Sequence, residues 1–286
     1  MFGTIRRSFQ LVKLCLHVLA TDKELVLFPV FSSICTGIVV LTFLGVGFGI
    51  GALDRLEAGS LGAIDLAVAL AFYILSSFVI IFFNSALVFA AHERLAGGDP
   101  NIGSGLRGAS NRIGPIFMWA VIAGTVGLIL RILAGQASER QGFLGIIAAI
   151  VVALLGAAWS LLTFFVVPLI VIERRPFGEA FKTSLSMIRS TWGDQVAANF
   201  GLGIAALLAF LLAAALSVLL FFILSPLGAT GVVIAILAAV LMVVAVALVF
   251  ATLDGIYKAA LYSYAATGVV PTLFPDETIR NAFRQR

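Results

Sequence analysis

Charged residues are scarce in this 286-residue chain, where Asp, Glu, Lys and Arg together make up 11% of the positions. A typical soluble domain is about 25% charged and about 45–50% apolar. This chain is 62% apolar, and its mean hydropathy is +1.15. The deficit of charge excludes an ordinary soluble enzyme and a disordered protein. The composition instead predicts an integral membrane protein that is built mostly from helices.

Cysteine and histidine are also rare, with two of each in the chain. Cys15 and Cys35 lie before and inside the first long apolar run, so we predict no disulfide framework. None of these four residues belongs to a cluster with the spacing of zinc ligands, so we predict no metal site. His92 precedes Glu93, but the second histidine that a zinc protease carries four residues later is missing.

The sequence also lacks a phosphate-binding loop and the Gly-x-Ser-x-Gly motif of a nucleophilic serine. Its carboxylates are scattered, and no spacing brings two of them together for acid–base catalysis. We therefore expect a protein that is not an enzyme and that needs no cofactor. A membrane-embedded enzyme, the alternative, would have to use three carboxylates near the ends of apolar runs: Glu93, Glu173 and Asp254.

Six apolar runs are long enough to cross the hydrocarbon of a bilayer, which takes about 20 helical residues. We place these spans near residues 28–53, 64–91, 115–133, 143–172, 196–224 and 231–253. The predicted fold class is therefore all-α, a polytopic bundle of six transmembrane helices. The predicted domains are an amphipathic N-terminal segment over 1–27, a transmembrane domain over 28–268 and a tail over 269–286.

The distribution of basic residues predicts the orientation of the chain. Fifteen of the eighteen Lys and Arg residues lie in the N-terminal segment, the second and fourth connections and the C-terminal tail. Arg55, Arg131 and Arg140 lie on the other side. By the positive-inside rule, both termini are expected in the cytoplasm.

Amphipathic segments precede the predicted hairpins on the cytoplasmic side. Residues 5–19 and 177–188 each place apolar side chains on one helical face, and residues 106–113 do so more weakly. The ends of the second and sixth spans, 90–98 and 260–268, match each other at three positions. This pattern predicts three repeated units, each an amphipathic helix followed by a hairpin, related about an axis along the membrane normal.

The polar faces of these segments are basic, which has two interpretations. They recruit anionic lipid or a protein partner, or they seal the inner rim of the bundle while their long side chains reach the headgroups. The candidate lipid-facing basic rim consists of Arg6, Arg7, Lys13, Arg174, Arg175, Lys182 and Arg189.

No ionisable residue lies at the centre of a predicted span, where a charge is costly and marks function. Asn84 is the most deeply placed polar side chain, and we expect its amide to bond to Ser160 or Thr163 at a similar depth on the fourth span. Trp159, near the middle of the membrane, either packs or lines a cavity. The candidate intramembrane polar cluster is therefore Asn84, Trp159, Ser160 and Thr163.

Small residues and a proline predict how two of the spans are shaped. Gly45, Gly47, Gly49 and Gly51 are spaced by two, which predicts close contact between helices at that point of the first span. Pro168 lies in the inner part of the fourth span, where it removes a backbone donor and predicts a kink.

Several stretches of the chain resemble an uncharacterised family of prokaryotic six-span membrane proteins, namely 82–87, 157–168, 191–195, 199–203 and 257–264. This resemblance implies an architecture and a prokaryotic inner-membrane location, but no activity. The positions that it singles out are Asn84, Trp159, Pro168, Trp192, Gly193 and Asn199. The chain is also distantly similar to the membrane domain that precedes some glycerophosphodiester phosphodiesterases, although it contains no catalytic phosphodiesterase domain.

These observations predict two alternative functions. The first is a non-enzymatic scaffold or accessory module that binds lipid or a partner at its basic cytoplasmic face. The second is a transporter or channel for a neutral or lipid-like substrate, lined by the intramembrane polar cluster. The expected partners are membrane lipids, anionic ones included, together with a protein partner or a second copy of the chain. Nucleic acid is not expected.

Overall fold

The computed structural model describes residues 13, 15–60, 62–139, 143–191 and 200–267. Every regular element in these residues is a helix, and six helices are long and apolar enough to span a membrane. The prediction of an all-α, six-span protein is thus confirmed. The long helices are α2 (Leu27–Gly49), α4 (Ala63–Leu95), α6 (Ile113–Glu139), α7 (Phe143–Leu162), α10 (Phe200–Leu224) and α11 (Ala229–Thr267).

Shorter elements connect or precede the long helices. They are η1 (Lys23–Val26), α3 (Ala52–Glu57), α5 (Ile102–Ser110), α8 (Val166–Val171), α9 (Phe177–Thr191) and η3 (Ser225–Leu227). The helical residues 15–21, α5 and α9 each come before a pair of long helices, in the order that the sequence predicts.

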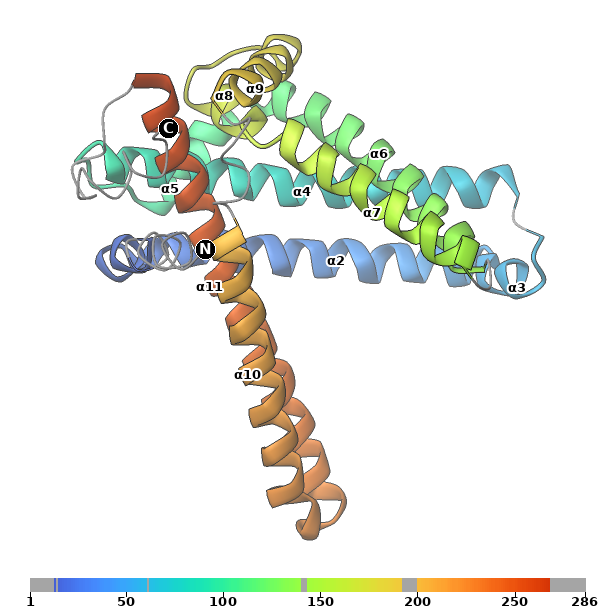
Figure 1. Ribbon diagram of the computed structural model, residues 1–286. Helices are drawn as coiled ribbons and strands as arrows, with labels where there is room; N and C mark the ends of the chain where they lie inside the picture. The colour runs from blue at the N-terminus through green and yellow to red at the C-terminus, as the bar shows by residue number, and fades with distance from the viewer. Residues whose placement is uncertain (1–12, 14, 61, 140–142, 192–199, 268–286) are drawn as a thin grey trace.

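The long helices pair as three hairpins, α2 with α4, α6 with α7, and α10 with α11. Figure 1 shows that the first two hairpins run side by side, with α6 along α4, and that the α10–α11 hairpin leaves their common region at a steep angle. The third hairpin therefore diverges from the other two. We call the common region the base; it consists of residue 13, residues 15–21, the start of α2 at 27–28, residues 85–95 of α4, α5, residues 163–176 with α8, α9 and residues 252–262 of α11.

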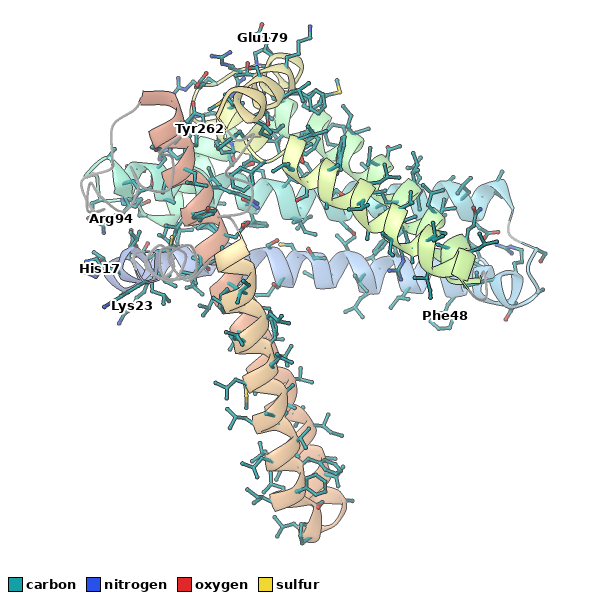
Figure 2. All side chains as sticks on the ribbon, in the orientation of Figure 1. His17, Lys23, Phe48, Arg94, Glu179 and Tyr262 are labelled. Carbon is teal, nitrogen blue, oxygen red and sulfur yellow. The ribbon has the colours of Figure 1, made fainter. Side chains whose placement is uncertain are left out.

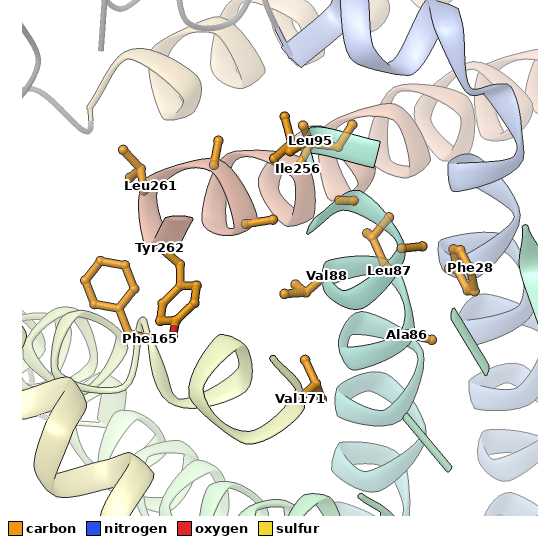
Figure 3. Close-up of a cluster of buried hydrophobic side chains, with 14 of the residues drawn as sticks. Phe28, Ala86, Leu87, Val88, Leu95, Phe165, Val171, Ile256, Leu261 and Tyr262 are labelled. Carbon is orange, nitrogen blue, oxygen red and sulfur yellow. The ribbon is translucent and has the colours of Figure 1, made fainter. Parts of the chain in front are cut away.

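The buried core lies in the base. Phe28, Leu87, Leu169 and Ile256 come from four different helices, and Phe165 comes from the turn before α8; each is at most 2% exposed. Figure 3 shows part of this cluster where α4, α8 and α11 meet. In contrast, leucine, isoleucine and phenylalanine side chains are exposed along the long helices outside the base (Figure 2). Such surfaces are as apolar as lipid chains, and they fit a membrane environment better than water.

Cys15 reports on the docking of the N-terminal helical residues into this core. Its side chain is 1% exposed, and burial, followed by the nearby charge of Asp254, raises the pKa of its thiol to about 12. The thiolate is the form that reacts with alkylating reagents. We therefore expect iodoacetamide at pH 8 to leave Cys15 unmodified in the folded protein and to modify it after denaturation, as read by peptide mass spectrometry. Rapid modification of the folded protein would contradict this docking.

The fourth span is broken, as Pro168 predicts, but the break precedes the proline. Helix α7 ends at Leu162 and α8 begins at Val166. A continuous helix would bring the proline ring against the carbonyl of Phe164, four residues earlier. The chain instead turns, with the amide of Phe164 bonded to the carbonyl of Leu161 and that of Val166 bonded to Thr163.

The sixth span extends far beyond its predicted end at residue 253, because α11 continues to Thr267. The charge of Asp254 suggested the membrane boundary, but this carboxylate pairs one helical turn later with the ammonium of Lys258 at 2.6 Å. The additional turns place Ile256 and Tyr262 in the core of the base.

The expectation of close helix contact at Gly45, Gly47 and Gly49 is wrong for the described chain, because a Cβ at any of them would meet nothing within 4 Å. These glycines lie toward the C-terminal end of α2, near α3 (Figure 1). Close approach occurs in the base instead. A Cβ on Gly105 would lie 2.5 Å from the ring of Phe28, and one on Gly255 would lie 2.4 Å from a methyl group of Leu87.

Candidate functional site

The structure does not form the hydrogen bonds that were predicted to join Asn84 to the rest of the intramembrane polar cluster. Asn84 lies on α4 and Ser160 on α7, and each of these helices packs against α6. The hydroxyl of Thr163 donates to the carbonyl of Trp159 in its own segment, at 2.8 Å. The buried Oδ1 atom of Asn84 has no hydrogen-bond partner among the described residues. The expected bond from Asn84 to Ser160 or Thr163 is therefore not formed.

Trp159 belongs to an aromatic cluster that docks α9 against α6 and α7. Its ring centroid lies 5.8 Å from that of Trp119 on α6 and 6.3 Å from that of Phe181 on α9. Phe177 stacks on Trp119 with its centroid 5.7 Å away. Of the two interpretations of Trp159, these contacts favour packing, because aromatic pairs at such distances are stabilising.

Substitution of Asn84 by leucine tests whether its amide holds helices together. Because Oδ1 is buried without a partner, we expect its removal to leave the free energy of unfolding unchanged or to raise it. The measurement is thermal unfolding in detergent micelles. A loss of about 1 kcal/mol, the typical value for an interhelical hydrogen bond in a membrane, would mean that the amide is bonded after all.

Ser160 is the member of the polar cluster that lines an apolar crevice. The crevice has a volume of about 710 Å³ and lies between α7, α10 and α11. Its walls are apolar, with Phe164 and Phe250 among them, and its polar groups include Ser160, Asp254 and Tyr257. Asn84, Trp159 and Thr163 do not line it.

The predicted basic rim separates into exposed and engaged side chains. Lys13, Arg174 and Lys182 are exposed at the base. Arg175 is engaged, because it pairs with the carboxylate of Glu173 and donates to the hydroxyl of Thr183 at 3.0 Å. Arg6, Arg7 and the side chain of Arg189 lie outside what the structure describes.

Glu173 connects this rim to the end of α11. One of its oxygens accepts from Arg175, and the other accepts from the hydroxyl of Tyr262. Tyr262 is 2% exposed and lies in the base where α11 meets α8 (Figure 3). Both carboxylate oxygens of Glu173 are thus occupied in holding α11 against the α8–α9 connection. The sequence gives no signal for this contact, since the two residues are 89 positions apart.

Arg112, a basic residue of the second connection, caps the C-terminal end of α8. Its Nε donates to the carbonyl of Ile170 at 3.3 Å, and its Nη2 donates to the carbonyl of Arg175 at 2.8 Å. The backbone amide of Arg175 also donates to the carbonyl of Leu169 at 3.2 Å. These bonds satisfy carbonyl groups that a helix end otherwise leaves without partners. A cation at this position also interacts favourably with the helix dipole.

Beside this cap, three arginines converge on a cavity of about 290 Å³. Arg107 comes from α5, Arg112 from the turn after α5, and Arg174 from the α8–α9 connection. Glu93 is the carboxylate that lines the cavity, and its Oε2 accepts from the hydroxyl of Ser104 at 2.9 Å. We call this the arginine cavity. It is lined by Phe89, Glu93, Ser104, Arg107, Gly108, Asn111, Arg112, Val171 and Arg174.

The backbone at Arg174 is held in an unusual conformation. Its φ is +58°, in the left-handed region, and it is the one non-glycine residue with positive φ in the described part of the chain. This conformation costs an L-residue about 1–2 kcal/mol, and such strain clusters at functional sites. The tight connection between α8 and α9 therefore fixes the backbone from which the Arg174 side chain lines the cavity.

Comparison with known protein families gives a match over residues 63–272 to DUF6159, a family of unknown function. The chain belongs to the DUF6159 family. No curated protein and no solved structure matches the chain.

The DUF6159 match begins at the first residue of α4 and extends through the end of α11. It includes the arginine cavity, the Ser160 crevice and most of the base. The predicted resemblance to an uncharacterised membrane family is thus confirmed, while the more distant similarity to the domain that precedes glycerophosphodiester phosphodiesterases stays a prediction.

Proposed function

We propose that this DUF6159 protein is a non-enzymatic module of a prokaryotic inner membrane that binds anionic lipid at the cationic face of its base. The observation that carries the proposal is the separation of apolar and cationic surfaces. The hairpins expose aliphatic and aromatic side chains along their length. Most of the exposed described cations, namely Lys13, Lys23, Arg107, Arg174 and Lys182, lie at or beside the base, and Arg131 lies toward the other end of α6.

The orientation follows from the same separation. The base contains the connections that are rich in Lys and Arg, and the positive-inside rule assigns such connections to the cytoplasm. Both termini are then cytoplasmic, and the three hairpin tips point outward. In this orientation the exposed cations reach the headgroups of the inner leaflet, where anionic lipids create a negative surface potential.

Charge neutralisation tests this proposal. A variant with Arg6, Arg7, Lys13, Lys182 and Arg189 all changed to glutamine should lose affinity for anionic lipid, by about 1 kcal/mol for each charge that reaches the surface. The measurement is native mass spectrometry of protein extracted gently from vesicles that contain phosphatidylglycerol and phosphatidylcholine. We expect the native chain to retain phosphatidylglycerol preferentially.

The control for this experiment exchanges lysine for arginine and arginine for lysine at the same five positions, which keeps the charge. It should retain phosphatidylglycerol like the native chain. Equal enrichment in the neutralised variant would refute the proposal. A soluble protein subunit that is retained instead of lipid would replace it by binding of a protein partner.

The Ser160 crevice favours a second candidate, movement of a lipid-like substrate along the α7, α10 and α11 surfaces. The crevice is mostly apolar, and Ser160, Asp254 and Tyr257 provide polar groups for a headgroup. Gly203 lines it, and a Cβ there would meet nothing within 4 Å. Gly203→Leu should therefore fill the crevice without disturbing its neighbours. If this function is real, the variant slows lipid translocation in proteoliposomes, whereas Asn84→Leu has no effect.

A further inference from the structure

We propose that the arginine cavity is a binding site for a phosphate group. The cavity carries a net positive charge. Three guanidinium groups line the cavity against the single carboxylate of Glu93, which leaves two unbalanced positive charges in a volume of about 290 Å³. Like charges that face one small volume repel each other, and a bound dianion removes this repulsion.

The side chains that line the cavity offer N–H donors to a ligand. Arg107 and Arg174 form no hydrogen bond or ion pair within the part of the chain that the structure describes. Arg112 is fixed by its bonds from Nε and Nη2, neither of which uses Nη1. Asn111 adds a side-chain amide to the lining. Guanidinium groups present paired donors whose geometry matches phosphate oxygens, which makes arginine the preferred residue for this ligand.

The backbone that carries the three arginines is held in place before a ligand binds. Arg107 and Arg112 are placed by one short helix and its C-terminal turn, and Arg174 is held by a strained left-handed backbone. Gly108 forms part of the wall, and a Cβ there would lie 2.5 Å from the ring of Phe89. A larger residue at 108 would push this ring, which also lines the cavity. The open volume therefore depends on a glycine and on a rigid connection, as expected of a site that forms before its ligand binds.

The phosphate has two possible sources, a lipid headgroup and a free phosphate. Only the lipid source rests on the proposed function, since it needs the base to face the headgroups. The cations of the cavity are also separate from the five that are neutralised in the test of that function. Failure of one proposal therefore leaves the other to be judged by its own variants.

The test compares two double variants that remove the same charge. Arg107→Gln with Arg174→Gln empties the cavity of its free cations and keeps Arg112, which the cap of α8 needs. Lys13→Gln with Lys182→Gln removes two exposed cations that do not line the cavity. Arg174→Gly is a third variant, because glycine adopts a positive φ without strain. It should fold at least as well as the native chain while losing one cation of the site.

In the first arm, thermal unfolding in micelles is followed with inorganic phosphate against chloride at equal ionic strength. In the second arm, native mass spectrometry measures retention of phosphatidic acid against phosphatidylglycerol, a comparison in which the general attraction of the basic rim for anionic lipid cancels. We expect Arg107→Gln with Arg174→Gln to weaken binding roughly a hundredfold, since it removes two charge-assisted contacts. Arg174→Gly should weaken it about tenfold. The lysine pair should leave the response to inorganic phosphate unchanged and should lower retention of the two lipids equally, because Lys13 and Lys182 belong to the basic rim.

Each outcome decides the matter. A preference for phosphatidic acid over phosphatidylglycerol that only the cavity variants lose identifies a lipid headgroup as the ligand. Stabilisation by inorganic phosphate alone, lost in the same variants, identifies a free phosphate. No response in either arm, or an equal loss of this preference or of the phosphate response in the lysine pair, would overturn the proposal, because the cavity would then act only through general charge.

Discussion

Ser184→Ala is expected to lower the free energy of unfolding by about 2–3 kcal/mol, because it removes a hydroxyl that bonds two backbone groups inside the fold. Ser184 lies on α9 and is fully buried. Its hydroxyl donates to the carbonyl of Leu162 at 2.8 Å and accepts from the amide of Phe165 at 3.3 Å. These two groups flank the break between α7 and α8. The hydroxyl of Ser184 thus bonds a backbone group on each side of the break and joins α9 to the fourth span.

The matched control is Ser186→Ala, two residues further along α9. Ser186 is exposed, and its hydroxyl donates to the carbonyl of Thr183 in the same helix at 2.9 Å. Its loss should change the free energy of unfolding by less than about 0.5 kcal/mol. Both variants are measured by thermal unfolding in micelles. Similar stabilities for the two would show that the break does not depend on Ser184.

Gly105→Ala, which adds one methyl group to the base, is expected to lower the free energy of unfolding strongly. Gly105 lies on α5, and an added Cβ would sit 2.5 Å from the Phe28 ring and 2.9 Å from the backbone carbonyl of Ala86. Phe28 is 1% exposed, so its ring has no free space to move into. Overpacking of this kind costs about 1–3 kcal/mol, and a backbone that must also shift places the cost at the upper end. The measurement is again thermal unfolding, together with the yield of folded protein.

Gly114→Ala on α6 is the control for this substitution, since a Cβ there meets nothing within 4 Å. Alanine is the better helix former by about 1 kcal/mol in a helix interior. The control should therefore be neutral or stabilising. If Gly105→Ala behaved in the same way, α5 would not pack against α2 and α4 as closely as the structure has it.

Neither the arginine cavity nor the pair of hydrogen bonds made by Ser184 could be predicted from the sequence, and the reason is the same for both. Arg112 and Arg175 are joined across 63 positions, and Ser184 and Leu162 across 22. Each residue alone is unremarkable in its segment, because Ser and Arg are common in connections. Only the packing of α5, α8 and α9 into one base brings them together. In the same way, Asn84 and Ser160 have similar predicted depths but lie on helices that each pack against α6.

The amino-acid sequence by itself determined the all-α class, the six spans, the hairpin order and the break near Pro168. These properties follow from local physics, namely the length of apolar runs, helical periodicity and the missing donor of proline. The tertiary structure decided which helices touch, where the core lies and which cations converge. The sequence could not show these contacts, because apolar helices in lipid associate through close packing and through single polar contacts. The glycines at 45–49 and 105 illustrate this, since only the position of the neighbouring helix distinguishes open space from a contact.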